Sequence, residues 1–255
     1  MSASARFSEA RLKVLSESET KGGIGTLSEK LIHKILKFYV EPDDSCHECP
    51  VDGCVADVLN ADGVTEIQTG NFQYLLPKLK KLLQNHSVRV VLPLTNSRTV
   101  HYVDKITGEV VSSRKSPRRD AINHAACELY KIKELIPTEN LRVSLIFLDL
   151  DEYRYKTEKK SWQKPKDSRI SVIPSGIARE LELLHKEDYL AFLPSKLRDT
   201  FTAAQLGKII RLDSRRTHNT LTLLLHIGLI SRERSGKTYI YTKVGQNPHF
   251  GIKKL

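Results

Sequence analysis

Two carboxylates and one side-chain amide lie close together in the sequence, with a spacing that suits a metal site. Asp57 falls on a predicted strand, Cys54–Leu59. Glu66 and Gln68 fall on the next predicted strand, Val64–Thr69, after a turn-forming Asn-Ala-Asp-Gly segment that indicates a hairpin. Because side chains alternate along a strand, Glu66 and Gln68 share one face, and Asp57 can join them from its neighbouring strand. Carboxylates beside a backbone carbonyl are the ligands that Mg²⁺ prefers, so we predict a site for Mg²⁺ or Mn²⁺ here.

The sequence has a large excess of basic residues. Its 255 residues include 41 Lys and Arg against 30 Asp and Glu, which gives a formal net charge of +11. The excess is concentrated in three segments, Arg98–Arg119, Arg154–Arg169 and Gly207–Lys243. Concentrated positive charge favours a polyanionic partner, so we expect the protein to bind nucleic acid.

Neither a membrane segment nor a zinc site is expected. No apolar run approaches the roughly 20 residues that a membrane helix needs, and the N-terminus lacks the apolar core of a signal peptide. We therefore expect a cytoplasmic protein with no membrane partner. Three cysteines and one histidine stand close together, but no second ligand pair follows them, so we expect reduced thiols and not a structural zinc. These four residues are Cys46, His47, Cys49 and Cys54.

The chain divides into four predicted segments. Residues 1–25 are rich in Ser, Glu, Lys and Gly, which is typical of a flexible arm. Residues 26–155 are predicted to form an α/β domain with a mixed central sheet. Residues 156–186 are polar and basic and are predicted to be a connector. Residues 187–255 are predicted to form a small C-terminal domain.

Helix and strand patterns alternate through the predicted α/β domain. The order strand, helix, strand after the hairpin predicts a crossover that places Val64–Thr69 parallel to Val88–Leu94. In the crossover helix the leucines are predicted to face inward, and Lys78, Lys80 and Lys81 outward. The remaining predicted elements are a helix from Thr26 that ends at Pro42, the crossover helix Phe72–Asn85, a hairpin of Val100–Asp104 and Glu109–Ser113, a helix at Ala121–Leu135 and a strand at Leu141–Leu150.

The C-terminal segment looks like a winged helix-turn-helix. Thr202 and Gln205 form a capping-box pattern that opens one helix, and Asp213 begins a second. Two short strands around Ser235-Gly236 follow as a wing. In such a module the second helix enters the major groove and the wing follows the backbone. The residues expected to contact nucleic acid are Arg215, Arg216, His218 and Asn219 of the second helix, Arg232, Arg234 and Lys237 of the wing, and Arg114, Lys115, Arg118 and Arg119 of an upstream basic tract.

The segment from about Gly25 to Arg154 resembles the PD-(D/E)XK, or restriction-endonuclease-like, nuclease superfamily. The matching features are Glu29 on the leading helix, Asp57 on the second strand, Glu66-Ile67-Gln68 on the third, and then the crossover helix and strand. The resemblance implies a mixed central sheet flanked by helices. It also implies that Asp57 and Glu66 bind metal together with the carbonyl of Ile67, and that Glu29 assists as an outer ligand or as a ligand of a second metal.

Two positions depart from the pattern of the superfamily. Ala56 stands where the motif has Pro, which is a common variation. Gln68 stands where Lys is usual, and an amide has no proton that titrates near neutrality. Gln68 would therefore orient the attacking water or the scissile phosphate, and a bound metal would have to generate the hydroxide.

The leading interpretation is a metal-dependent endonuclease that hydrolyses phosphodiester bonds of duplex or branched DNA. Its predicted catalytic residues are Glu29, Asp57, Glu66 and Gln68. Cleavage of both strands would call for a homodimer, because one site cuts one strand. A non-catalytic DNA-binding regulator with a nuclease-like core is the main alternative, and Gln68 favours it. A winged-helix protein that docks other proteins is a third.

Overall fold

The computed structural model of the chain describes residues 2–20, 28–117, 120–156 and 169–244. Within them, seven strands form a mixed sheet in the order β1-β2-β3-β4-β6-β7, with β5 paired to the far half of β4. The strands are β1 (His47–Val51), β2 (Cys54–Asn60), β3 (Gly63–Ile67), β4 (Val88–Val103), β5 (Val110–Lys115), β6 (Leu141–Tyr155) and β7 (Arg169–Leu183). The helices beside this sheet are α1 (Ala3–Thr20), α2 (Ser28–Val40), α3 (Phe72–Leu82) and α4 (Ile122–Leu129), with short 3-10 turns η1 (Asp44–Cys46), η2 (Tyr130–Ile132) and η3 (Lys186–Phe192).

The predicted hairpin and crossover are both confirmed. Strands β1, β2 and β3 run antiparallel in sequence, and α3 then carries the chain over to β4, which is parallel to β3. Gly63 has a φ of +112° at the hairpin turn, and a Cβ atom there would lie 2.4 Å from the carbonyl oxygen of Ser87. Glycine is therefore required where the hairpin passes the start of β4.

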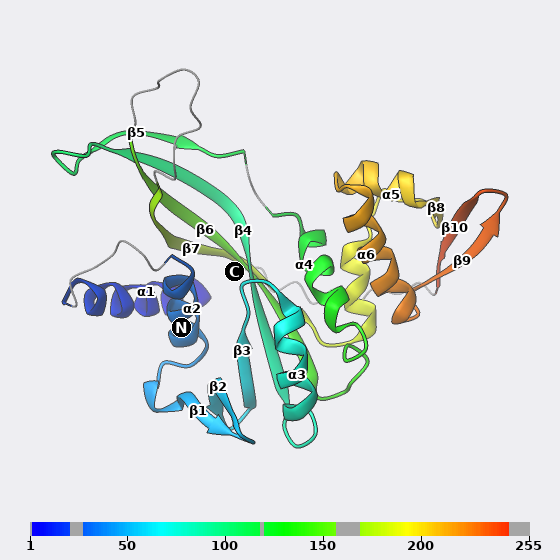
Figure 1. The fold of residues 1–255 in the computed structure, drawn as a ribbon, viewed down its shortest axis with the longest axis horizontal. Helices are drawn as coiled ribbons and strands as arrows, with labels where there is room; N and C mark the ends of the chain where they lie inside the picture. Colours follow the sequence, from blue (N-terminus) through cyan, green and yellow to red (C-terminus); the bar gives the residue numbers. More distant parts are fainter. Residues whose placement is uncertain (1, 21–27, 118–119, 157–168, 245–255) are drawn as a thin grey trace.

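Helices cover both faces of the sheet (Figure 1). On one face α1 and α2 share an apolar core with sheet residues such as Val91 and Ile146. On the other face α3 and α4 share a core with sheet residues such as Val90 and Leu145. Adjacent residues of β4 and of β6 thus enter opposite cores, as expected for strands buried on both sides. The predicted mixed α/β architecture with flanking helices is confirmed.

The prediction of a flexible arm over residues 1–25 is wrong for the described part of that segment. Residues Ala3–Thr20 form α1, which packs against α2 and β7. Phe7 is 1% exposed and Val14 is fully buried. The buried stripe of this helix is narrow and includes two alanines, so its many charged and polar residues concealed the helical period. Residues 21–25 lie outside the described chain.

The predicted connector over residues 156–186 is also corrected. Arg169–Leu183 forms β7, which pairs antiparallel with β6 along most of its length. This strand lies at the edge of the sheet, where polar side chains remain in water, so it lacks the apolar run of an inner strand. Residues 157–168, which include Trp162, lie outside the described chain.

Strand β4 is longer than the sequence indicated. Two separate strands were expected at Val88–Leu94 and Val100–Asp104, but a single strand runs from Val88 to Val103 and pairs with β6 throughout. A shift of register between Thr95 and Ser97 interrupts this pairing without ending it. The bulge explains why the alternation of side chains breaks in the sequence while the strand continues.

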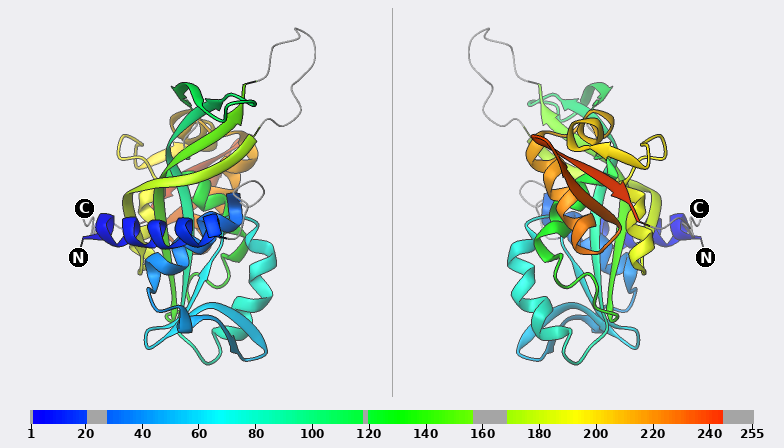
Figure 2. Two further views of the ribbon diagram at one scale, coloured as in Figure 1. Left: turned by 90° about the vertical axis from the view of Figure 1, so that its left-hand side faces the viewer. Right: turned by 90° about the vertical axis from the view of Figure 1, so that its right-hand side faces the viewer.

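The C-terminal part contains the two predicted helices and the predicted hairpin, in the order β8 (Thr200–Thr202), α5 (Ala203–Ile210), α6 (Ser214–His226), β9 (Ile230–Ser235) and β10 (Thr238–Lys243). Thr202 and Gln205 exchange the two hydrogen bonds of the predicted capping box. Strands β8, β10 and β9 form a small sheet, and Figure 2 (right) shows its β9–β10 hairpin standing beside α6. Helix α6 packs against α4, and its Leu221 and Leu224 belong to the same core as the large sheet.

Candidate functional site

Asp57 lies where β2 and β3 separate. The last pair of their ladder joins Val58 to Thr65. Beyond this pair, the amide nitrogen of Ile67 has no partner on the backbone of β2. It donates instead to Oδ2 of the Asp57 carboxylate, over 2.7 Å. His33 Nε2, which projects from α2, lies 3.0 Å from the same oxygen. Both contacts fix the orientation of the Asp57 carboxylate and end on one of its two oxygens.

The surroundings of Asp57 keep it ionised. Burial raises the pKa of this carboxyl, but hydrogen bonding and charge from His33, together with the amide of Ile67, lower it further. The net result is a pKa below its usual value. Asp57 therefore presents a negative charge at a largely buried position, with a side chain that is 15% exposed.

Glu66 is the most deeply buried acid of the site, with 3% of its surface exposed. Its Oε2 accepts a hydrogen bond of 2.5 Å from Lys78 Nζ. Its Oε1 is buried and has no hydrogen-bond partner among the described residues. Burial raises the pKa of Glu66 to about 7, and the negative charge of Asp57 also raises it, while Lys78 opposes the shift. A buried carboxylate oxygen without a partner is costly, so it identifies a position where a cation or a donor from outside the chain can bind.

Lys78 was predicted to face solvent, and that prediction is wrong. Its side chain is 25% exposed, and its Nζ donates to Glu66 and, at 2.7 Å, to the carbonyl oxygen of Val55. The signal was present in the sequence, because Lys78 stands three residues after Leu75 and four before Leu82, at the border of the buried face of α3. The flexible stem of a lysine at such a border can carry its ammonium group inward.

Gln68 and Glu29, the other predicted catalytic residues, have no described contact with Asp57 or Glu66. The side-chain amide of Gln68 donates a hydrogen bond to the carbonyl oxygen of Gly70, so it turns back along its own chain. Glu29 lies in the first turn of α2, four residues before His33. The side chain of Glu29 is outside the part that the structure describes.

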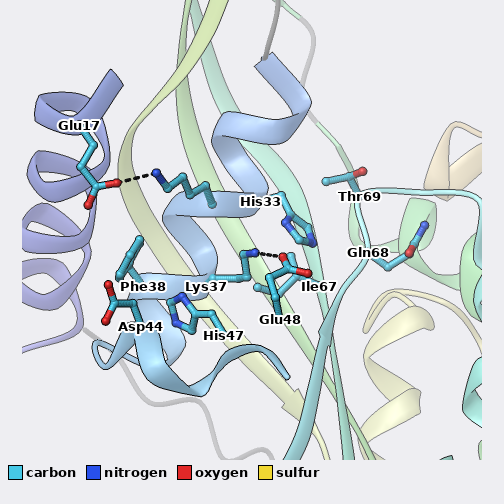
Figure 3. Close-up of a pocket in the computed structure, with 11 residues that line it drawn as sticks. Glu17, His33, Lys37, Phe38, Asp44, His47, Glu48, Ile67, Gln68 and Thr69 are labelled. Carbon is cyan, nitrogen blue, oxygen red and sulfur yellow. Dashed lines mark hydrogen bonds and ion pairs between the residues drawn. The ribbon is translucent and has the colours of Figure 1, made fainter. Parts of the chain in front are cut away.

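A pocket of about 660 Å³ opens beside these residues, between α2 and the end of β3. Figure 3 shows His33 and Lys37 of α2 together with Ile67, Gln68 and Thr69 at its walls. Lys37 pairs with Glu48. Lys34 likewise pairs with Glu17, so both lysines of this pocket are balanced by acids of its own wall. His33 connects the pocket to the site, because its ring contacts Asp57.

Asp57 and Glu66 are the side chains of the site that could offer carboxylate oxygens to a metal. Within residues 2–20, 28–117, 120–156 and 169–244, no group of three or more His, Cys, Asp or Glu is placed to hold a metal. Two carboxylates meet at Asp57 and Glu66, and Mg²⁺ commonly takes one or two protein carboxylates and completes its shell with water and phosphate. Cys46, Cys49 and Cys54 are free thiols.

The predicted nucleic-acid contacts lie in two places. Arg114 of β5 donates from Nε to the hydroxyl of Tyr102 at 3.2 Å, and Lys115 follows it at the exposed end of the strand. Arg118 and Arg119 lie outside the described chain. The second group is on the C-terminal unit, beyond α4 from α1 and α2 (Figure 1). Its members are Arg215, Arg216 and His218, which are exposed on α6, Asn219, which is half-buried there, and Arg232, Arg234 and Lys237, which are exposed on the hairpin.

Comparison with known proteins gives a family. The residues matched by the domain of unknown function DUF8091 are 30–184, which include His33, Asp57, Glu66 and Lys78 and extend through β7. An uncharacterized protein of Treponema pallidum (strain Nichols) is 27% identical over 190 residues, which cover 72% of this chain and 74% of that protein. No solved structure matches the chain. In the described part, no helix is both long and apolar enough to cross a membrane. Since the matched region spans more than half of the sequence, the chain belongs to the DUF8091 family.

Proposed function

We propose that this protein is a metal-dependent nuclease that hydrolyses phosphodiester bonds of DNA at the site formed by Asp57, Glu66 and Lys78. One observation carries the proposal. The buried Oε1 of Glu66 has no partner among the described residues, while its other oxygen receives the Lys78 ammonium group. The neighbouring Asp57 is held ionised. Such a site is prepared to bind a cation and then a phosphate.

The order of the elements supports a restriction-endonuclease-like core. A leading helix, three antiparallel strands, a crossover helix and a parallel strand follow one another as α2, β1, β2, β3, α3 and β4. The two acids stand on the second and third of these strands, where the PD-(D/E)XK resemblance puts them. This agreement in topology and position is independent of the charges at the site.

Asp57 and Glu66 would hold Mg²⁺ or Mn²⁺, with the carbonyl oxygen of Ile67 as a further ligand. When bound, the metal lowers the pKa of a coordinated water and offsets the charge that develops on the phosphate. His33 holds the Asp57 carboxylate in place through its hydrogen bond. Glu66 must lose its proton to bind a cation, and its pKa of about 7 makes this step depend on pH near neutrality.

Lys78 fills the role that Gln68 cannot. Its ammonium group lies beside Glu66, as the lysine of an E-x-K pair would, although it comes from α3 and not from β3. From there it can donate to a non-bridging oxygen of the phosphate or orient the attacking water. The departure at Gln68 is therefore compensated in space by a residue 10 positions further along the chain.

The C-terminal unit would dock the DNA as a winged helix. Its support is the order of β8, α5, α6, β9 and β10, together with the exposed basic residues on α6 and on the hairpin. Arg215 and His218 lie three residues apart on α6, so they occupy one face of that helix. Cleavage of both strands of a duplex would then need two copies of the chain.

The test measures cleavage of supercoiled plasmid, branched DNA and single-stranded RNA in Mg²⁺, in Mn²⁺ and in chelator. Wild type is compared with Glu66→Ala, Lys78→Ala and the control Lys80→Ala, which removes an exposed lysine from the same helix. We expect metal-dependent cleavage that survives in Lys80→Ala and is lost in the other two variants. Salt-sensitive binding without cleavage of any substrate would contradict the proposal.

That contrary result would favour a DNA-binding regulator with a nuclease-like core. One observation supports this second function. The described residues bring two acids to the site and no third acidic, histidine or cysteine ligand that would complete a metal cluster. In a regulator, the Lys78–Glu66 pair would serve to hold α3 on the sheet.

A further inference from the structure

Three arginines from three strands converge on one buried carboxylate, away from the acids of the candidate active site. Arg98 Nη1 of β4 lies 2.9 Å from Glu152 Oε2. Arg154 Nε of β6 lies 2.5 Å from Glu152 Oε1, and Arg169 Nε of β7 lies 3.5 Å from the same oxygen. We call these four residues the arginine cluster. It joins two of the basic segments of the sequence, which are far apart along the chain.

The three arginines of the cluster share one buried carboxylate. The Glu152 side chain is 1% exposed. Burial raises its pKa, but the hydrogen bonds of Arg154 and Arg98 lower it further, so the pKa falls below its usual value and Glu152 stays ionised. Three guanidinium groups thus face one negative charge. Arg98 Nε is also buried without a hydrogen-bond partner among the described residues, which leaves a donor unused.

A cavity of about 250 Å³ adjoins the cluster. Arg98 and Arg169 form part of its wall, together with Thr95 and Asp120. Asp120 is the acidic residue of this wall, and its Oδ2 accepts a hydrogen bond of 2.8 Å from the amide nitrogen of Thr95. Two arginines held by Glu152, and one acid whose carboxylate accepts from a backbone amide, therefore line the cavity.

The cavity adjoins the pocket beside α2 and the end of β3. Thr69 lines both this cavity and the larger pocket beside His33 and Gln68. Thr69 directly follows the Glu66–Gln68 motif. A nucleic-acid strand that passes the end of β3 can therefore place phosphates in both the pocket and the cavity. Arg114 extends the basic surface further, since it pairs with Val100, which itself lies opposite Glu152 in the sheet.

We infer that Arg98 and Arg169 form a phosphate-binding subsite for the nucleic-acid strand whose scissile phosphate lies at Asp57 and Glu66. Guanidinium groups bind phosphate through paired hydrogen bonds, and two of them on one cavity wall fix its position. Glu152 serves to hold the arginines in place. The identity of the ligand as a nucleic-acid strand rests on the proposed function, whereas the preference for a phosphate rests on the cluster itself.

The test uses Arg169→Ala, because the Arg169 side chain is 44% exposed and its loss leaves Arg98 and Arg154 to neutralise Glu152. The charge-matched control is Arg142→Ala, at the opposite, exposed end of β6. A fluorescent single-stranded oligonucleotide is titrated by anisotropy in chelator at several salt concentrations, with and without a 5′-phosphate. Circular dichroism and a thermal melt establish that each variant is folded.

We expect Arg169→Ala to bind about tenfold more weakly and to lose about one unit of the salt slope, while Arg142→Ala stays within about twofold of wild type. Arg98→Lys keeps the positive charge but loses the planar guanidinium group that donates paired hydrogen bonds, so it should also weaken binding. Equal losses for both oligonucleotides assign an internal phosphate, and a loss confined to the 5′-phosphorylated one assigns a terminal phosphate. Unchanged binding in folded Arg169→Ala and Arg98→Lys overturns the inference.

The binding assay separates this inference from the proposed function. It contains no metal and requires no cleavage, so its outcome does not depend on nuclease activity. Loss of binding in Arg169→Ala, combined with a wild type that cuts no substrate, would reject the nuclease and retain the phosphate subsite. Cleavage by wild type with unchanged binding in both Arg169→Ala and Arg98→Lys would retain the nuclease and reject the phosphate subsite.

Discussion

Lys78 Nζ lies 2.5 Å from Glu66 Oε2, so a helix supplies the ammonium group that stands beside the acid of β3. The same nitrogen donates to the carbonyl oxygen of Val55 on β2, which ties α3 to both strands of the hairpin. The lysine therefore has a fixed position at the site and does not depend on a bound ligand to order it.

Lys78→Ala should lower the rate of DNA cleavage by about 100-fold or more, because one preorganised charge donor is removed from the transition state. Adding Gln68→Lys to this variant should restore part of the rate, since it returns a lysine to the third strand. Single-turnover cleavage at saturating metal measures both effects. A Lys78→Ala enzyme with the wild-type rate would show that the Lys78–Glu66 pair is structural.

Glu66→Gln should stabilise the protein at high pH. The carboxyl of Glu66 has a reference pKa of 4.5 and a pKa of about 7 in the fold, so the folded state holds more protons than the unfolded state between these values. Stability that involves Glu66 is therefore full below pH 4.5 and declines as the pH rises to about 7. At pH 8 we expect the variant to be more stable by at most about 3 kcal/mol, which is the free energy that corresponds to this shift in pKa.

Urea unfolding of wild type and Glu66→Gln at pH 5 and pH 8 measures this difference. Glu134→Gln is the matched control, because the side chain of Glu134 is 64% exposed. Equal free energies of unfolding for wild type and Glu66→Gln at pH 8 would show that burial of the Glu66 charge carries no cost.

Charge changes on the hairpin should alter duplex binding in opposite directions. Arg232→Ala should weaken binding and lower the salt slope by about one unit, whereas Glu233→Gln removes a repulsive charge beside it and should strengthen binding. Both residues are exposed on β9. Anisotropy titrations with a labelled duplex at several salt concentrations provide the measurement. If neither substitution changes the affinity, the hairpin does not contact DNA.

Phe7→Ala should destabilise the fold by about 3–5 kcal/mol, as is usual when a large buried side chain is truncated. Phe7 is 1% exposed and meets the ring of Tyr39 edge-on, with 5.8 Å between ring centroids. Leu12→Ala is the control on the same helix, because Leu12 is 64% exposed and should change the free energy of unfolding little. Equal thermal midpoints for the two variants would mean that α1 does not contribute to the core.

The parts of the fold that the sequence predicted well depend on local signals. The hairpin around Gly63, the capping box at Thr202 and the end of α6 at Gly228 each use residues whose conformational preferences are strong on their own. The parallel pairing of β3 and β4 followed from the position of α3 between them.

The remaining features depend on packing between distant segments. Strand β7 is polar because it lies at an edge, and α1 has a narrow apolar stripe because it covers a small area of the sheet. The site shows the same limit. Asp57 and Glu66 are near one another in the sequence, but the contacts of His33 and Lys78 arise from helices on opposite faces of the sheet, which no local pattern specifies.

The position of α4 has a consequence for how the chain unfolds. Leu129 of α4 shares one continuous apolar core with Leu221 and Leu224 of α6 and with the large sheet. Neither the sheet nor the C-terminal unit can therefore open without exposing the apolar surface of the other, so the two should melt in a single cooperative transition. A fragment that ends at Leu183 would keep the residues of the candidate site but would leave part of this core in water, and it should aggregate.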